Sequence, residues 1–121
     1  MNVPTYVQRS RKAGAKQPES TRYCGRGTKY GNDHPVIKDG DTWMVEDEYP
    51  EWYGTRVDAN QEAVERYQMD MGYILQGNPA YYDDLLSFKH LSCFCDPSLP
   101  CHVKDVIIPH LERRLLELEN A

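Results

Sequence analysis

Three of the chain's four cysteines and one of its histidines fall within ten positions, in the segment Leu91–Ile108 (LSCFCDPSLPCHVKDVII). Cys93 and Cys95 end an apolar run, a proline-bounded loop follows, and Cys101 and His102 stand at the start of a predicted helix. The amide dipoles at a helix N-terminus lower the pKa of a thiol, which makes it a better nucleophile and a better metal ligand. The segment therefore predicts either a zinc site or a site that acts on, or grips, a phosphate-bearing ligand.

The spacing of these residues keeps several interpretations open. Structural zinc sites usually pair cysteines two to four residues apart and take the second pair from a distant segment. Cys93, Cys95, Cys101 and His102 would all come from one loop, so no cofactor is favoured and zinc is the alternative to cysteines that simply pack in the core. Cys101 and His102 are the catalytic candidates. We expect Cys93 to be packing, Cys95 and Cys101 to approach each other, and the ring of His102 to face the pocket mouth.

A second motif, Cys24–Pro35 (CGRGTKYGNDHP), combines three glycines with basic residues. Such a loop lets backbone amides approach a phosphate, while arginine forks hold its oxygens in pairs. The motif is neither a Walker loop nor a dinucleotide GxGxxG motif, and glycines of a tight turn are the plainer interpretation. Tyr23, Tyr30 and Trp43 either stack on a base or pack in the core. The predicted phosphate-binding residues are Arg9, Arg11, Gly25, Arg26, Lys29, Gly31, Asn32 and His102.

Apolar and turn patterns predict the strands that must position these motifs. Short strands are expected within Thr5–Ser10 and Thr21–Cys24, which are rich in Thr, Tyr and Val, and a buried strand within His90–Cys95. A hairpin is expected about Asp39, where a glycine follows. The remainder of the acidic and aromatic segment at about 39–58 is assigned no element.

Apolar residues at three- and four-residue spacing predict the helices. One helix is expected over Gln61–Gln76, with Asp58 or Asn60 as its cap. The final helix begins at His102, and Pro109 must kink or restart it because proline lacks an amide donor and clashes with the preceding turn.

The order of elements indicates the fold class. With a shorter helix at Pro79–His90, the chain reads as strands, helix, helix, strand and helix, which is typical of an α/β protein. We predict one domain over residues 1–121, a small layered, Rossmann-like sheet with about three helices. In such folds ligands gather where strands end and helices begin, which is where the cysteines and His102 fall.

Charge is distributed unevenly along the 121 residues, whose net charge is -5. Up to Lys38 there are eight basic and two acidic residues, a net charge of +6, while the remainder carries -11. The basic part is the one that would meet an anion. No apolar run approaches the roughly 20 residues that span a bilayer, and the first residues lack a secretory pattern. We therefore expect a cytoplasmic protein without a membrane partner, in a compartment where thiols stay reduced.

Three ordered stretches, YVQRSRKAGA, YCGRGTKYGN and LSCFCDPSLPCH, resemble the domain of unknown function 4326 family of small prokaryotic and bacteriophage proteins. The resemblance covers nearly the whole chain and implies host cytoplasm if the protein is phage-encoded. Two departures are Asp33 and His34, which stand where the family usually has proline and an aromatic residue. A third is Asp105, one position later than the usual acidic residue. The family name implies no chemistry.

Taken with the charges, the motifs predict that the chain binds a nucleotide or related phosphorylated ligand between the basic loop and the Cys-His helix start. The protein would be a phage-encoded nucleotide binder or a nucleotide-processing enzyme. The alternative is a nucleic-acid or host-protein interaction module with a structural zinc site, based on the basic N-terminal third and on Trp43, Trp52 and Tyr53. Solvent or capping roles are expected for His34 and His110.

Overall fold

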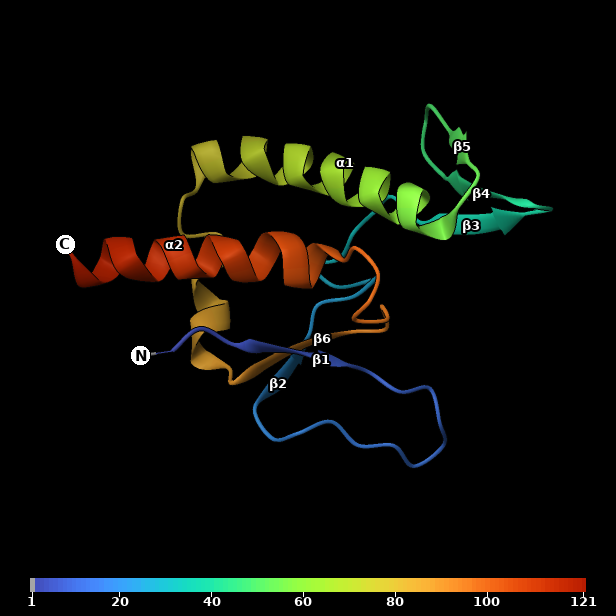
Figure 1. Cartoon of the computed structure of the whole chain (residues 1–121). Coiled ribbons are helices and arrows are strands. Elements are labelled where there is room, and N and C mark those ends of the chain that lie inside the picture. The colour runs from blue at the N-terminus through green and yellow to red at the C-terminus, as the bar shows by residue number, and fades with distance from the viewer. Residues whose placement is uncertain (1) are drawn as a thin grey trace.

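Two three-stranded sheets and two long helices make up the computed structural model, which describes residues 2–121 (Figure 1). One sheet is parallel, in the order β1-β6-β2, and the other is antiparallel, in the order β3-β4-β5. This mixed arrangement with helices confirms the predicted α/β class. The strands are β1 (Thr5–Gln8), β2 (Thr21–Tyr23), β3 (Val36–Asp39), β4 (Thr42–Val45), β5 (Glu51–Tyr53) and β6 (His90–Cys93).

The parallel sheet brings the motif-bearing segments to one edge. β6 lies in the middle, with Thr5 of β1 and Thr21 of β2 both in register with His90. Because all three strands run the same way, their carboxyl ends meet, and the chain leaves them at Arg9, at Cys24 and after Cys93. The central strand is buried, as expected for a parallel strand with neighbours on both sides.

The long helix α1 (Arg56–Gly77) begins five residues before the predicted start at Gln61. Its N-cap is Thr55, whose hydroxyl oxygen accepts a hydrogen bond from the amide of Asp58 at 3.2 Å, so the predicted caps Asp58 and Asn60 are wrong. A Thr cap satisfies one of the otherwise unpaired amides of the first turn. The helix continues through Gly77, and Asn78 follows as its C-cap.

The final helical segment has two parts. A π-helical turn, η2 (Val103–Ile107), follows His102 and passes directly into α2 (Ile108–Glu119). Pro109 stands in the first turn of α2, directly after the wider turn, and because proline has no amide to donate, the helix restarts there. The short helix predicted at Pro79–His90 is a 3-10 segment, η1 (Asp83–Ser87).

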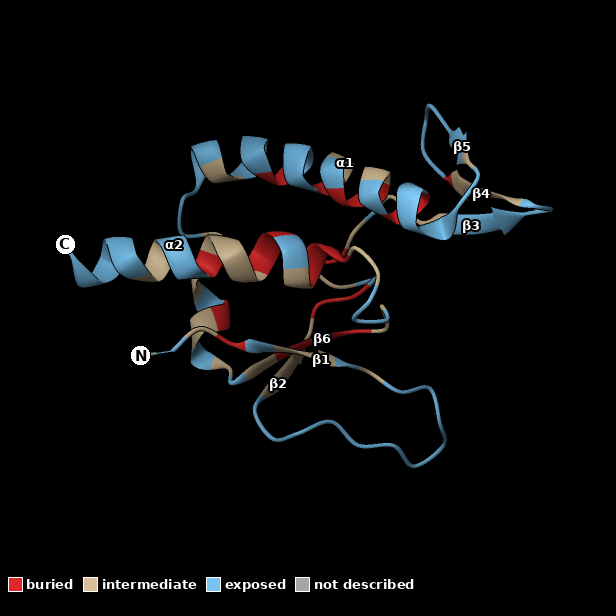
Figure 2. Cartoon of the chain, viewed as in Figure 1, coloured by how far each residue is buried: buried red, intermediate tan, exposed pale blue. Residues whose placement is uncertain are grey.

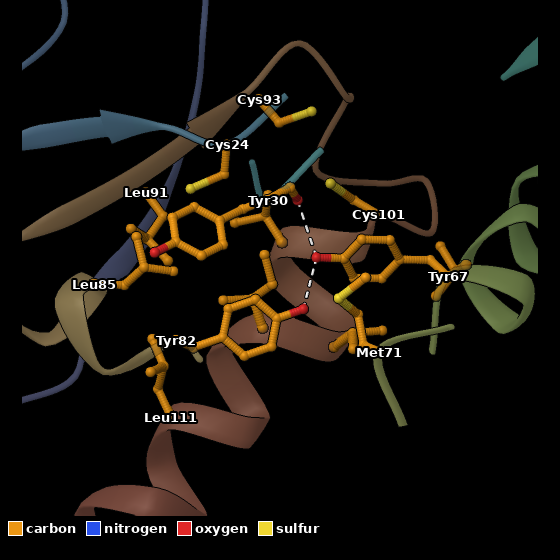
Figure 3. Close-up of a cluster of buried hydrophobic side chains, with 14 residues drawn as sticks. Cys24, Tyr30, Tyr67, Met71, Tyr82, Leu85, Leu91, Cys93, Cys101 and Leu111 are labelled. Carbon is orange, nitrogen blue, oxygen red and sulfur yellow. Dashed lines mark hydrogen bonds between the residues drawn. The ribbon is translucent and has the colours of Figure 1, made fainter. Parts of the chain in front are cut away.

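In Figure 1, α1 and α2 lie on the same side of the parallel sheet, and both begin toward the edge where the strands end. Figure 2 shows their buried faces turned toward each other and toward the sheet. The main core joins Tyr67 and Met71 of α1 to Leu91 of β6 and Leu111 of α2 (Figure 3). A smaller core around Val45 holds the antiparallel sheet against the first turns of α1. Within residues 2–121, no helix is both long and apolar enough to cross a bilayer.

Candidate ligand-binding site

A cavity of about 560 Å³ lies where the parallel strands end and the helices begin. Tyr23 at the end of β2 and Cys93 at the end of β6 form part of its wall, and Phe94 and Cys95 continue it. α1 contributes its first turns from the opposite side. The basic loop and the Cys-His segment, predicted to meet at this edge, therefore do line one cavity. Its polar or ionisable lining residues are Arg11, Arg26, Asn32, His34, Arg56, Asn60, Cys93, Cys95, Cys101, His102 and Tyr23.

Three arginines, Arg11, Arg26 and Arg56, give the cavity its charge. Among residues 2–121, no carboxylate lines it, and none of the three arginines forms an ion pair. The guanidinium of Arg11 lies 4.0 Å from the centroid of the Phe94 ring, an arrangement that leaves its in-plane N–H groups free to donate. A cavity with three unpaired cations and no lining anion suits an anionic ligand.

Arg9 and Lys29, the other two cations predicted to bind phosphate, do not line this cavity. The guanidinium of Arg9 lies 4.7 Å from the Tyr23 ring centroid, in an adjacent hollow of about 380 Å³ that Arg11 and Phe94 also line. The amine of Lys29 lies 4.7 Å from the ring centroid of Tyr81, and Lys29 does not line the main cavity. Arg9 thus lies beside the main cavity and Lys29 away from it, although both belong to the same basic third of the chain as Arg26.

The predicted loop residues Gly25, Gly31 and Asn32 serve the fold of the loop. A Cβ on Gly31 would overlap the backbone carbonyl oxygen of Gly25, so only glycine fits there, whereas a Cβ on Gly25 would overlap the outer end of the Tyr23 side chain, which would have to move. Asn32 lines the cavity, but its side-chain amide donates to the carbonyl of Ala63 in α1 at 3.0 Å. Its carbonyl oxygen accepts from the amide of His34. These contacts fasten the loop against itself and against α1.

His102 is buried, not directed toward the cavity mouth as expected. Its Nε2 lies 2.7 Å from the carbonyl oxygen of Cys24, which only accepts, so Nε2 carries the proton. Burial lowers the pKa of His102, so the ring is neutral at neutral pH. Its ring packs edge-on against Tyr67 while still forming part of the cavity wall. The hydrogen bond to Cys24 joins the final helix to the end of β2.

The sulfurs of Cys93, Cys95 and Cys101 form one cluster, with every pair within 4.8 Å. Cys95 and Cys101 approach each other as predicted, and Cys93 does more than pack, because its sulfur lies 3.6 Å from that of Cys95. All three cysteines are free thiols. Figure 3 shows Cys93 and Cys101 on facing segments, at the end of the core where β6 leaves it. His102, included in the alternative zinc set, does not belong to the cluster.

Hydrogen bonds within the cluster divide the thiols into one acidic group and two weakly acidic ones. Bonds from Cys101 and then Cys95 lower the pKa of Cys93. Bonds with Cys101 and Cys93 raise the pKa of Cys95, and the bond with Cys93 raises that of Cys101 to about 11. The lowered pKa expected at the helix start thus falls on Cys93. The amide of Cys101 is already bonded to Asp105, whose carboxylate adds negative charge there.

A family model described as domain of unknown function (DUF4326) matches residues 7–113. The chain belongs to the DUF4326 family. None of the curated proteins and none of the solved structures compared with this DUF4326 chain matches it.

The three sequence motifs that resemble the DUF4326 family lie together in the structure. Arg11 from the first motif, Arg26 from the second and the cysteine cluster from the third all line the one cavity, although the motifs are far apart in the sequence. The matched region ends within α2, so it contains every residue that lines the cavity.

Sequence reasoning missed Arg56 and Asn60, the α1 residues of the DUF4326 cavity. The signal was present: Thr55 and Asp58 stand three residues apart, the spacing of a helix capping box, which would have started the helix at Arg56. Asn60 is buried, and its amide reaches the carbonyl of Pro100 at 3.5 Å, across the cavity wall.

His34 was also missed, having been assigned a solvent or capping role. It lines the cavity, and its Nδ1 and Nε2 each lie 2.6 Å from a carboxylate, of Asp47 and Asp70 respectively. These two carboxylates occupy both nitrogens of the ring. Asp47 also pairs with Arg66, so this group ties the antiparallel sheet to α1. His34 is therefore fully engaged and offers no donor to a ligand.

The aromatic residues divide between cavity and core. Of the three proposed to stack on a base, only Tyr23 lines the cavity, whereas Tyr30 is in the main core and Trp43 packs against the smaller one. Trp52 is 53% exposed, while Trp43 and Tyr53 are half-buried. His110 of α2 packs against Tyr82, and its Nε2 has no hydrogen-bond partner among the described residues.

Proposed function

We propose that the chain binds a nucleotide or a related phosphorylated small molecule in the arginine-lined cavity. The observation that carries the proposal is the convergence of Arg11, Arg26 and Arg56 on one cavity without carboxylate partners. Arginine forks hold phosphate oxygens in pairs, and such charge-assisted bonds are among the strongest that proteins form. Tyr23 and Phe94 beside them offer apolar surface for a base.

The proposed setting is the cytoplasm, that of a bacterial host if the chain is phage-encoded. A reducing compartment keeps the three clustered cysteines as thiols, which is the state in which they line the cavity. The cavity lies at the carboxyl edge of the parallel strands, the position that ligands occupy in open α/β sheets.

The test is a calorimetric titration of chelator-treated, reduced protein with nucleoside mono-, di- and triphosphates, dinucleotides and cyclic nucleotides. We expect saturable binding of at least one compound, weakened about 10- to 100-fold by Arg26→Ala because one charged bond is lost. Lys29→Ala is the matched control: it removes a cation from the same loop but outside the cavity, and it should leave the affinity unchanged. Equal loss in both variants, or no saturable binding, would refute the proposal.

The second candidate is an interaction module with a structural zinc ion. The observation that favours it is the sulfur cluster, in which Cys93, Cys95 and Cys101 lie within metal-binding distance of one another. A structural zinc contributes directly to folding, so its removal unfolds small domains. Elemental analysis of protein purified without chelator measures bound zinc, and circular dichroism after chelation measures the fold. Stoichiometric zinc whose removal unfolds the chain would favour this candidate, with partners then sought by pull-down from lysate.

A further inference from the structure

The spacing of the three cysteine sulfurs fits one metal ion. Zinc bonds thiolates at about 2.3 Å with tetrahedral angles, which places neighbouring sulfurs about 3.8 Å apart. The Cys93 and Cys95 sulfurs are 3.6 Å apart, and all pairs including Cys101 lie within 4.8 Å. The upper limit of 4.8 Å exceeds this tetrahedral spacing by only about 1 Å. The cluster is therefore close to a trithiolate site before any ion binds.

Hydrogen bonds outside the cluster hold the backbone of these cysteines in place. The Tyr6 hydroxyl lies 2.5 Å from the carbonyl oxygen of Cys95 and 3.2 Å from that of Cys93. The amide of Cys101 donates to Asp105 at 2.8 Å. Metal ligands are commonly positioned by such supporting bonds, because they fix the direction of the first-sphere atoms. The backbone is thus held at all three cysteines, by Tyr6 of β1 at Cys93 and Cys95 and by the nearby Asp105 at Cys101.

The site lacks a fourth protein ligand. The one group of potential metal ligands found within residues 2–121 consists of these three cysteines. The nearest imidazole in sequence, His102, gives its Nε2 proton to the carbonyl of Cys24. Structural zinc sites usually have four protein ligands, whereas sites with three keep a fourth position for water or substrate. A trithiolate site here would belong to the open kind.

The open position would face the cavity. Cys93, Cys95 and Cys101 all line it, together with Arg26 and the other arginines. A divalent ion with three thiolates carries a net charge of about -1, which by itself repels an anion. Three lining arginines outweigh that charge, so an anionic oxygen can reach the ion.

We propose that Cys93, Cys95 and Cys101 hold a zinc-type divalent ion whose fourth position takes an oxygen of the phosphorylated ligand in the cavity. The metal half of this inference stands on the sulfur geometry alone, and the ligand half rests on the proposed function. The ion and the arginines then bind the same phosphate from two sides. Unlike a structural zinc, we expect this ion to be removable without unfolding the chain, because the main core also contains many side chains of both helices and β6 that are not ligands.

The test of the metal half uses Co2+, whose absorption reports thiolate ligation and tetrahedral geometry. Reduced, chelator-stripped protein should take up one Co2+ per chain, with a thiolate charge-transfer band and intense visible bands. Cys95→Ser should lose most of the charge-transfer intensity. Cys24→Ser is the matched control, since Cys24 is a buried free cysteine outside the cluster, and it should keep the full spectrum. No uptake, or equal spectra for wild type and Cys95→Ser, would overturn the site; circular dichroism verifies that each variant is folded.

The ligand half is tested by adding inorganic phosphate and pyrophosphate to the Co2+ protein. We expect a saturable shift of the visible bands that needs at least tenfold more phosphate in Arg26→Ala than in wild type. Unchanged bands at saturating phosphate would overturn the direct bond to the ion. Nucleotide binding by metal-free protein without Co2+ uptake would sink this inference and leave the proposed function standing. Co2+ uptake without binding of any phosphate compound would sink the proposed function and the ligand half, leaving the metal site.

Discussion

At the residue scale, Tyr67 joins three separate segments of the core through one hydroxyl group. It donates to the carbonyl oxygen of Tyr30 at 2.9 Å and lies 2.7 Å from the hydroxyl of Tyr82, which therefore donates to it (Figure 3). All three tyrosines are almost fully buried. The contact with Tyr30 fixes the end of the basic loop against α1, close to where Asn32 makes its own bond to that helix. The loop that carries Arg26 is thus held by the core.

We predict that Tyr67→Phe lowers the free energy of unfolding by about 1–3 kcal/mol, because it leaves the carbonyl of Tyr30 and the hydroxyl of Tyr82 without their buried partners. Tyr82→Phe should cost less, since the bond from Tyr67 to Tyr30 survives. Urea unfolding of both variants measures the difference. A larger loss in Tyr82→Phe than in Tyr67→Phe would contradict the assigned directions of these hydrogen bonds.

At the element scale, the long helix α1 contains a glycine, Gly72, in its interior, which lowers its stability. Only its inner face is buried, and Gly72 lies on the exposed side, where an added Cβ would meet no atom within 4 Å. Glycine in a helix interior costs about 0.5–1 kcal/mol relative to alanine, because its backbone loses more conformational freedom on folding. The N-terminal turns, which supply Arg56 and Asn60 to the cavity, depend on the Thr55 cap instead.

Gly72→Ala should therefore raise the free energy of unfolding by about 0.5–1 kcal/mol, visible as a higher Tm. The contrasting substitution is Gly31→Ala, which should lower it by about 1–3 kcal/mol because the new Cβ overlaps the Gly25 carbonyl. Ligand affinity should be unchanged in Gly72→Ala. A Gly31→Ala protein as stable as wild type would show that the loop is not packed as tightly as the structure has it.

At the scale of the whole molecule, two arginines of the acidic part of the chain form ion pairs with its carboxylates, whereas the three arginines of the cavity form none. Arg66 bonds to Asp47, Glu51 and Glu62, and Arg114 bonds to Asp83 and Glu117. Arg11, Arg26 and Arg56 line the cavity and form no ion pair within residues 2–121. The overall charge of -5 opposes any extended polyanion that would have to lie along the rest of the surface.

Salt dependence distinguishes a nucleotide pocket from a nucleic-acid surface. We predict that affinity for the best nucleotide falls by no more than about tenfold between 50 and 200 mM salt, because a free nucleotide releases no condensed counterions. A backbone-binding surface with six to ten phosphate contacts would lose roughly a thousandfold or more over the same range. Fluorescence anisotropy with a labelled nucleotide and a labelled single-stranded oligonucleotide measures both. Tight, steeply salt-dependent oligonucleotide binding would favour the interaction module.

The sequence by itself determined the α/β class, the motif segments and the edge at which they meet. These features follow from local patterns: residue types and apolar runs locate the strands, and an α/β fold places ligand-binding segments where strands end and helices begin. Arg11, Arg26 and the approach of Cys95 to Cys101 were predictable for that reason. The Thr55 cap and Arg56 were also within reach of local signals.

Only the tertiary structure decided which of several similar side chains serve the cavity. Arg9 and Lys29 are cations of the same basic part of the chain as Arg26, yet neither lines the main cavity: Arg9 lies over Tyr23 in the adjacent hollow, and Lys29 lies over Tyr81. His102 bonds to the carbonyl of Cys24, 78 positions away, so no local pattern announces that its ring is buried. The sequence did not show that the sulfur of Cys93 would join those of Cys95 and Cys101. The direction of that side chain is set by packing between distant segments. Helix and strand formation are local events, whereas the choice among equivalent donors depends on contacts that exist only once the chain has folded.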